Sequence, residues 1–176
     1  MIYRSNIYLV GFMGSGKSRQ GQILASRIGR TFIDTDQVII AEKSMSVNQI
    51  FEQHGEAFFR DLELETVREI SEVEELVVAL GGGTPTIEAV WPLLKNTGKT
   101  VYIKRSPEQI LRQLHRYDNR PLLKHLRRSE APEFVRKMLA ERTQFYDRAD
   151  MILDCQDGWD KDETSKALQN LLEKNL

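Results

Sequence analysis

The chain has 176 residues, and its 25 lysines and arginines nearly balance its 26 aspartates and glutamates, for a formal net charge of -1. This length suits one domain spanning 1–176, and the near-neutral charge argues against a nucleic-acid coat protein. No apolar run approaches the ~20 residues that cross a bilayer, the first residues do not resemble a secretory signal, and the lone Cys155 excludes an internal disulfide. We therefore expect a cytoplasmic protein, monomeric, with neither nucleic-acid nor membrane partners.

Short apolar runs alternate with longer stretches of helical periodicity, a pattern typical of a parallel sheet covered by helices. The third run is continuously apolar, as expected of a strand that is buried on both faces. The sequence therefore predicts an α/β fold, a three-layer sandwich with a five-stranded parallel sheet and helices on both faces. The expected strands are Asn6–Val10, Thr31–Ile33, Leu76–Leu80, Thr100–Lys104 and Met151–Leu153.

The first strand leads into a glycine-rich loop that matches the phosphate-binding pattern GxxxxGK[ST] without a mismatch, and a helix over Lys17–Ile28 follows. Such a loop turns backbone N–H groups towards phosphate oxygens, and the helix N-terminus adds its positive end. We expect Lys17 to reach the β- and γ-phosphates and the Ser18 hydroxyl to ligate Mg²⁺. The protein is thus predicted to bind a nucleoside triphosphate. The expected nucleotide contacts in this loop are Gly11, Gly14, Ser15, Gly16, Lys17 and Ser18.

The second strand runs into Asp34-Thr35-Asp36. In an extended stretch these two carboxylates point the same way, and the carboxyl edge of an open α/β sheet is where ligands bind. Asp34 is expected to hold Mg²⁺ through water, and Asp36 to orient or deprotonate a substrate hydroxyl. The competing interpretation is that one of them only caps the following helix.

The middle of the chain is expected to be helical. Ser46 is a candidate N-cap, Gly55 breaks the periodicity, and a second helix runs from about residue 56 to Ser71. Together with the stretch after Asp34 these helices form an expected substrate-binding region of about 35–71. The third strand then runs straight into Gly81-Gly82-Gly83.

The second half adds a helix that starts at Ser106-Pro107, a strongly basic stretch, and a last helix over Asp160–Lys174. We interpret the basic stretch between Lys104 and Arg128 as belonging to a lid, at about 112–130, that closes over the phosphates of the nucleotide. Guanidinium groups suit carboxylates and phosphates, but taken singly Arg60, Arg120 and Arg142 are better explained as solvated surface residues.

The loop alone leaves GTPases, motors and small-molecule kinases open. A strand that ends in the Mg²⁺-associated Asp is missing, no guanine-reading Asn/Thr-Lys-x-Asp is present, and the chain is too short for a motor. A single compact kinase domain is the simplest interpretation.

At this point the sequence resembles the shikimate kinase family. The resemblance extends over residues 7 to 146, in the family's order. The motifs that carry it are Gly11–Ser18, Asp34-Thr35-Asp36, Gly55-Glu56 with Phe59-Arg60, Gly81-Gly82-Gly83, Arg120-Pro121-Leu122-Leu123, and Arg142 with Tyr146.

The resemblance implies an enzyme that transfers the γ-phosphoryl group of ATP to the 3-hydroxyl of shikimate, with Mg²⁺. It implies that Asp36 binds the hydroxyls and is the candidate base, and that Arg60 and Arg142 grip the carboxylate. The backbone around Gly81–Gly83 would offer further contacts, and Arg120 would reach the phosphates from the lid. Lys17, Asp36 and Arg120 are the implied catalytic residues.

Two alternatives remain at this stage: another small-metabolite kinase, such as gluconate kinase, or a nucleotide-binding regulator without turnover. The family also stacks an arginine on adenine, and both Arg112 and Arg116 lie near enough. Arg19 stands where family members usually have threonine, which puts the affinity for ATP in question.

Overall fold

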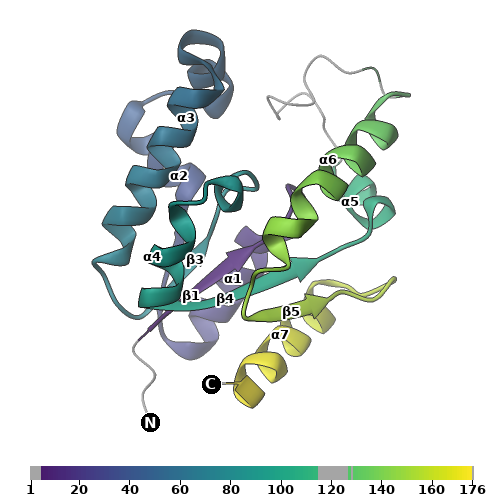
Figure 1. Ribbon diagram of the computed structural model, residues 1–176. Coiled ribbons are helices and arrows are strands. Elements are labelled where there is room, and N and C mark those ends of the chain that lie inside the picture. The colour runs from purple at the N-terminus through teal and green to yellow at the C-terminus, as the bar shows by residue number, and fades with distance from the viewer. Residues whose placement is uncertain (1–4, 115–126, 128, 176) are drawn as a thin grey trace.

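The structure is a computed structural model that describes residues 5–114, 127 and 129–175 (Figure 1). Its strands are β1 (Asn6–Val10), β2 (Thr31–Asp34), β3 (Leu76–Ala79), β4 (Gly98–Lys104) and β5 (Met151–Asp154). Its helices are α1 (Lys17–Ile28), α2 (Thr35–Lys43), α3 (Val47–Ser71), α4 (Val90–Thr97), α5 (Pro107–Gln113), α6 (Ala131–Tyr146) and α7 (Lys161–Asn175), with a short 3₁₀ helix, η1 (Thr84–Thr86).

The five strands form one sheet in the order β2-β3-β1-β4-β5, and every neighbouring pair is parallel. In the central strand, Tyr8 lies opposite Val78 of β3 and Thr100 of β4. This arrangement confirms the predicted α/β class. Because all strands run the same way, the loops after β1, β2 and β3 emerge at one edge of the sheet.

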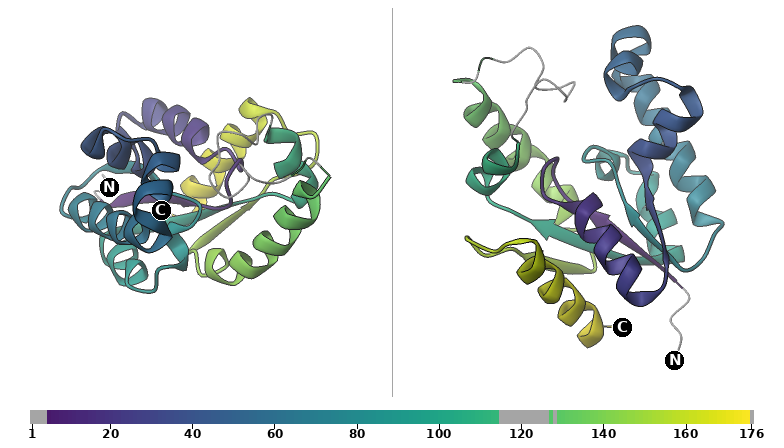
Figure 2. Two further views of the ribbon diagram at one scale, coloured as in Figure 1. Left: turned by 90° about the horizontal axis from the view of Figure 1, so that it is seen from above. Right: turned by 180° about the vertical axis from the view of Figure 1, so that it is seen from behind.

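Helices cover both faces of the sheet and make three layers (Figure 2). Alternation along β1 explains why: Ile7 and Leu9 pack against α1 and α7, while Tyr8 and Val10 belong to the core under α3, α4, α5 and α6. A third, smaller cluster around Ile39 joins α2 to the first half of α3. The carboxyl edge of the sheet lies between two groups of helices, α2 with α3 on one side and α5 with α6 on the other (Figure 1).

The expected break at Gly55 is present inside α3, where this residue has φ 83° and ψ 173° and a helix cannot continue. Ser46 caps the first half as predicted: its Oγ accepts from the Gln49 N–H, and the Gln49 side chain accepts from the Ser46 N–H. Ser106 and Gln109 form the same capping box at α5.

Two helices were not predicted, α4 and α6. Helix α4 has only eight residues and no side-chain cap, and it is held by burial of Trp91, whose indole N–H donates to the Pro85 carbonyl at 2.9 Å. Most of the lid expected at about 112–130 lies outside the described residues. In the described part of the chain, no helix is long and apolar enough to cross a membrane.

Asp150 joins the start of β5 to β4. Its Oδ2 accepts from the N–H and the hydroxyl of Thr100, each at 2.8 Å, and its own N–H donates back to Thr100 Oγ1 at 2.9 Å. Burial alone would raise the pKa of Asp150, but these hydrogen bonds and the charges of Lys99 and Lys95 hold it below its ordinary value. The ionised carboxylate therefore stabilises the fold.

We expect Asp150→Ala to lower the free energy of unfolding at pH 7 by about 1–2 kcal/mol, because hydrogen bonds to a charged group are lost. A carboxylate with a lowered pKa in the folded state stabilises above its unfolded pKa, and that stabilisation is lost as pH falls below about 4. Urea unfolding of both proteins from pH 7 to pH 3 checks this: the difference should shrink towards the acid end. A difference that is constant with pH would contradict it.

Candidate active site

The glycine-rich loop forms a compact turn between β1 and α1. Gly11, Gly14 and Gly16 all have positive φ, at 144°, 76° and 97°, and the Ser15 N–H closes the turn by donating to the Phe12 carbonyl at 3.1 Å. Gly16 is the N-cap of α1, and no side chain caps the helix there. The first N–H groups of α1 are therefore not covered by a side chain, as an anion site requires.

Lys17 lies inside this turn and is only 8% exposed. Its Nζ donates to the carbonyls of Gly11 and Phe12 at 2.8 and 2.9 Å. The ammonium group is thus fixed against the loop by backbone oxygens, and a phosphate bound at the loop would meet a cation that is already desolvated.

Ser18 and Asp34 meet beside the loop. The Ser18 hydroxyl donates to Asp34 Oδ2 at 2.5 Å, while Asp34 Oδ1 accepts from the N–H groups of Asp36 and Gln37. Asp34 is therefore the N-cap of α2, as the competing interpretation held, and its role towards Mg²⁺ stays a prediction. A hydroxyl and a carboxylate in contact are a donor set that fits Mg²⁺, which prefers oxygen ligands and keeps several waters.

A cavity of about 380 Å³ opens over the loop and is lined by Lys17, Ser18, Asp34, Asp36 and Gly82, among others. Both carboxylates face it, as predicted, but the reason given from the sequence was wrong. Asp36 does not lie in an extended stretch: β2 ends at Asp34 and Asp36 belongs to the first turn of α2. The helix turn, and not strand alternation, brings it to the cavity.

A smaller cavity of about 70 Å³ adjoins the first, and both are lined by Met13, Asp36 and Gly82. Arg60 from α3 and Arg142 from α6 also line the smaller one. The structure thus brings together two arginines that are 82 positions apart in the sequence. The spacing alone could not show this convergence.

Arg60 is held by two carboxylates of its own helix. Its guanidinium donates to Glu56 Oε1 at 2.7 Å and makes a short ion pair with Glu63. Burial alone would lower the pKa of Arg60, but the two carboxylates outweigh it and raise this pKa. The arginine is therefore charged and has little freedom to turn away from the cavity.

Glu63 is the most buried charged group of the site, with 1% exposure. Besides Arg60 it accepts from the Thr84 hydroxyl at 2.6 Å. Burial raises its pKa, Arg60 and Thr84 counteract this, and the negative charge of Asp36 raises it further. Glu63 was not predicted as a site residue. Its position three residues after Arg60 in a helix was the available signal, because that spacing places both on one face.

Arg142 lies on the other side of the cavity, with its Cζ 5.9 Å from the centre of the Phe12 ring. The ion pairs found for the described residues do not include Arg142. The Arg142 guanidinium is therefore available for an ion pair with an acidic ligand, whereas the charge of Arg60 is already offset by Glu56 and Glu63.

The glycine triplet is packed too tightly for side chains at two of its positions. A Cβ on Gly81 would lie 2.5 Å from Glu63 Oε1 and 2.7 Å from Asp36 Oδ1, and one on Gly83 would overlap the Arg60 guanidinium. The Gly81 N–H donates to Thr35 Oγ1 at 2.9 Å. The triplet therefore brings backbone into direct contact with the charged groups of the cavity.

Some predicted residues lie elsewhere. Gly11 and Ser15 shape the turn but do not line either cavity. Arg112, at the end of α5, makes a short ion pair with Asp157. Arg116 and Arg120 lie outside the described residues, so their roles stay predictions.

Two further residues support the site from outside and were not predicted. Thr35 is fully buried and bonds Gly81. Arg105, at the end of β4, donates from Nε to the Ser15 carbonyl at 2.9 Å and so ties the loop to the next strand. Nothing in the sequence distinguished Arg105 from the other basic residues around it.

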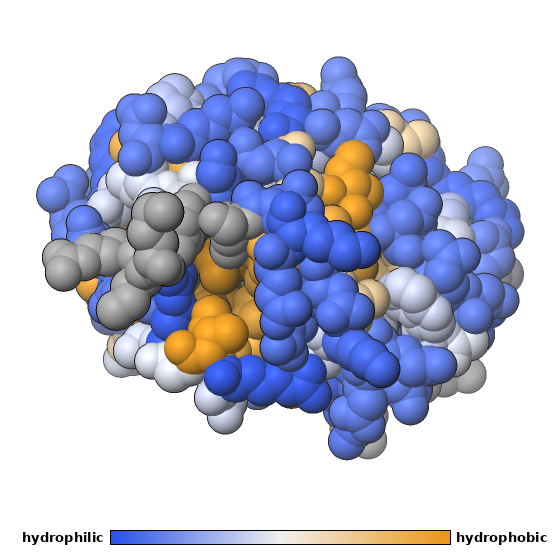
Figure 3. Space-filling model, turned by 90° about the horizontal axis from the view of Figure 1, so that it is seen from below, coloured by the Kyte–Doolittle hydropathy of each residue, from blue (hydrophilic) through white to orange (hydrophobic). Residues whose placement is uncertain are grey.

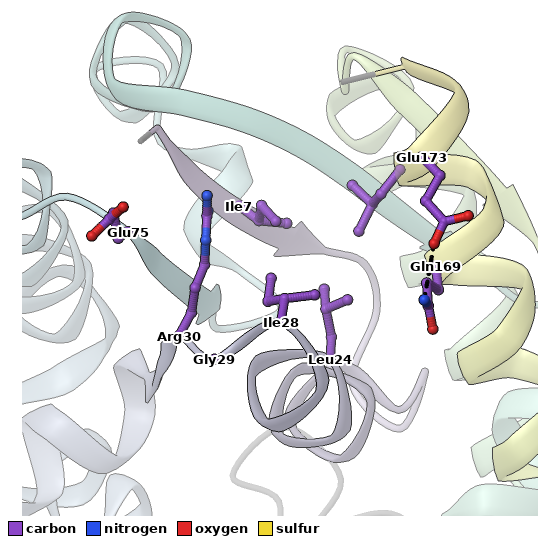
Figure 4. Close-up of a pocket in the computed structure, with 9 residues that line it drawn as sticks. Ile7, Leu24, Ile28, Gly29, Arg30, Glu75, Gln169 and Glu173 are labelled. Atoms are coloured by element: carbon purple, nitrogen blue, oxygen red, sulfur yellow. Dashed lines mark hydrogen bonds between the residues drawn. The ribbon is translucent and has the colours of Figure 1, made fainter. Parts of the chain in front are cut away.

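A larger cavity, of about 470 Å³, lies at the opposite edge of the sheet, between the end of α1 and α7. Apolar residues are exposed on that underside (Figure 3), and Figure 4 shows Ile7, Leu24 and Ile28 along the cavity with Arg30 and Glu75 beside them. None of the residues that line it belongs to the loop or to the carboxyl edge, so it is distinct from the candidate active site.

Known proteins are similar to this chain in sequence and in fold. The chain matches the family described as shikimate kinase over residues 13–173. A shikimate kinase of Chlorobaculum parvum is 40% identical over 158 residues, which cover 87% of this chain and 84% of that protein. One of Geobacter metallireducens is 41% identical over 149 residues, covering 85% and 82%.

Solved structures of shikimate kinases also match this chain. Shikimate kinase from Acinetobacter baumannii in complex with shikimate matches with a TM-score of 0.87 and 35% identity, over 98% of this chain and 95% of that one. Shikimate kinase from Bacteroides thetaiotaomicron matches with a TM-score of 0.88 and 32% identity, over 97% and 99%. These likenesses confirm the predicted kinase and its fold. The chain belongs to the shikimate kinase family.

Proposed function

We propose that this protein transfers the γ-phosphoryl group of ATP to the 3-hydroxyl of shikimate. The observation that supports this best is the adjoining pair of cavities: a phosphate-binding loop with Lys17 faces one, and Asp36, Arg60 and Arg142 face the other. Cations at one end and a carboxylate acceptor at the other suit a small acid that carries hydroxyl groups.

The phosphates of ATP lie on the loop, where the first N–H groups of α1 and the Lys17 ammonium offset their charge. Ser18 and Asp34 would hold Mg²⁺, the latter through water, and when bound this ion neutralises charge on the β- and γ-phosphates. Arg120, outside the described residues, is proposed to add a further positive charge from the lid.

Shikimate binds with its carboxylate between Arg60 and Arg142 and its hydroxyls towards Asp36. Asp36 then accepts the proton of the 3-hydroxyl as that oxygen forms its bond to the γ-phosphorus. The bond between the γ-phosphorus and the β–γ bridging oxygen breaks, and ADP leaves with the electron pair. The chain's main contribution is positioning, which phosphoryl transfer requires most.

The first experiment measures ADP release from Mg-ATP with shikimate, gluconate or nucleoside monophosphates as acceptors. We expect turnover with shikimate alone, and phosphorus NMR should show a phosphate monoester on its 3-oxygen. Turnover with gluconate instead would keep the kinase and overturn the acceptor. ATP binding without ADP release for every acceptor would favour the regulator.

The remaining expectations from the sequence stay predictions: a monomer in the cytoplasm, without nucleic-acid or membrane partners, with a substrate-binding region of about 35–71 and a lid of about 112–130. Sedimentation of the purified protein tests the first of them.

A further inference from the structure

We propose that Tyr146 is a positioning residue for the acceptor: its phenol fixes the Gly82–Gly83 peptide group so that the Gly83 N–H stays directed at the substrate carboxylate. This inference rests on the proposed function, because it assigns that peptide to acceptor binding. Tyr146 has no contact with the reacting atoms. It acts through the glycine backbone, and its hydroxyl also lies within hydrogen-bonding reach of Arg142.

The contact that carries the inference is a single hydrogen bond. The Tyr146 hydroxyl donates to the Gly82 carbonyl at 2.6 Å, across 64 positions of sequence. The phenol is fully buried, and burial raises its pKa even though the Arg142 charge counteracts this. The group therefore remains a proton donor at any pH at which the enzyme works.

A peptide group is planar, so fixing the Gly82 carbonyl also fixes the direction of the Gly83 N–H. In the described part of the chain, the Gly81 N–H donates to Thr35 Oγ1, and no hydrogen bond has the N–H of Gly82 or Gly83 as its donor. The N–H groups of Gly82 and Gly83 are thus uncommitted where both residues line the cavity with Arg60 and Arg142. Two unpaired donors beside two guanidinium groups make a site for a carboxylate.

Without the phenol this peptide would be free to turn, because glycine has the widest choice of backbone angles. The other bonds of the triplet lie on either side of it: Thr35 holds Gly81, and the Gly83 carbonyl accepts from the Thr86 N–H and hydroxyl. Among the described residues, Tyr146 is the one whose side chain donates a hydrogen bond to the Gly82 carbonyl.

The same helix face carries both parts of the carboxylate site. Arg142 and Tyr146 are four residues apart in α6, one turn of helix, so they project from the same side. The Tyr146 ring is itself held against Tyr102, with ring centres 5.2 Å apart. Any shift of α6 therefore moves the Arg142 guanidinium and the glycine peptide together.

The test is Tyr146→Phe, which keeps the ring and removes only the hydroxyl. We expect the KM for shikimate to rise about tenfold, the equivalent of one buried hydrogen bond, while the KM for ATP is unchanged and kcat falls much less. Tyr102→Phe is the matched control, because it removes the phenol of the other ring in the same pair, whose hydroxyl contacts Thr143 of the same helix and not the triplet. It should leave both KM values unchanged.

An unchanged KM for shikimate in Tyr146→Phe, a parallel rise in the KM for ATP, or an equal effect of Tyr102→Phe would each overturn the inference. Hydrogen exchange of the Gly81 and Thr84 amides, measured without substrate, provides a readout that does not depend on the acceptor. It should be faster in Tyr146→Phe than in the wild type or in Tyr102→Phe. A wild-type protein that ignores shikimate would refute the proposed function, and this exchange comparison would still decide the role of Tyr146.

Discussion

Lys17→Met is expected to lower kcat by about 10²–10³-fold, because it removes a preorganised positive charge from the place where charge develops on the transferred group. The substitution keeps an unbranched apolar side chain and removes only the terminal ammonium group. The ammonium group also donates to the Gly11 and Phe12 carbonyls, so the variant should in addition lose about 1–2 kcal/mol of stability. Steady-state ADP release and urea unfolding separate the two effects.

Lys43→Met is the control for Lys17→Met. Lys43 lies at the end of α2, pairs with Glu42 and lines neither cavity of the site, so its replacement should leave kcat unchanged. If Lys17→Met retained wild-type turnover while binding ATP, the loop would not be the place where the phosphoryl group is transferred.

The elements that the sequence predicted well are those with local signals. β1 and α1 have the expected bounds, because the buried strand and the glycine-rich loop define both ends. The helix starts at Ser46 and Ser106 and the break at Gly55 were also predicted from residue types alone. By contrast α4 and α6 lack side-chain caps, and α4 depends on tertiary burial of Trp91, so no local pattern marked them.

The same contrast between local and long-range signals applies to the candidate site. Its phosphate half lies in one continuous segment, Gly11–Ser18, and could be predicted from that segment. Its acceptor half is assembled from α2, α3, the triplet and α6, and only the family resemblance pointed to those residues together. Among the supporting groups, Thr35 acts through a buried contact with Gly81, which is far away in the sequence, and no spacing rule reveals it. Glu63, three residues after Arg60, could have been found from its helical spacing.

The two arginines of the acceptor half are prepared differently, and the difference is chemically useful. Arg60 is restrained by Glu56 and Glu63, which reduces the entropy lost when a ligand binds but also offsets its charge. Arg142 has no carboxylate partner among the described residues and supplies the net positive charge. A monoacid fits this balance better than a dianion such as a nucleoside monophosphate.

Asp36 decides whether the acceptor half only orients the hydroxyl or also removes its proton. Asp36→Asn keeps the size of the side chain and one acceptor oxygen but cannot take a proton. We expect kcat with shikimate to fall by about 10²–10⁴-fold, the usual contribution of a general base, with the fold intact. Asp61→Asn, the same change at an exposed residue of α3, should have no effect.

The outcome separates two mechanisms that share one geometry. In a loose transition state the attacking oxygen has formed little of its bond, so its proton need not leave early. If Asp36→Asn kept most of the wild-type kcat and only raised the KM for shikimate, the carboxylate would be an orienting acceptor, and positioning by Arg60, Arg142 and the triplet would account for the acceptor side of the rate. If kcat fell as expected while the KM changed little, the proton would pass to Asp36 in the transition state, and the first turn of α2 would carry the base.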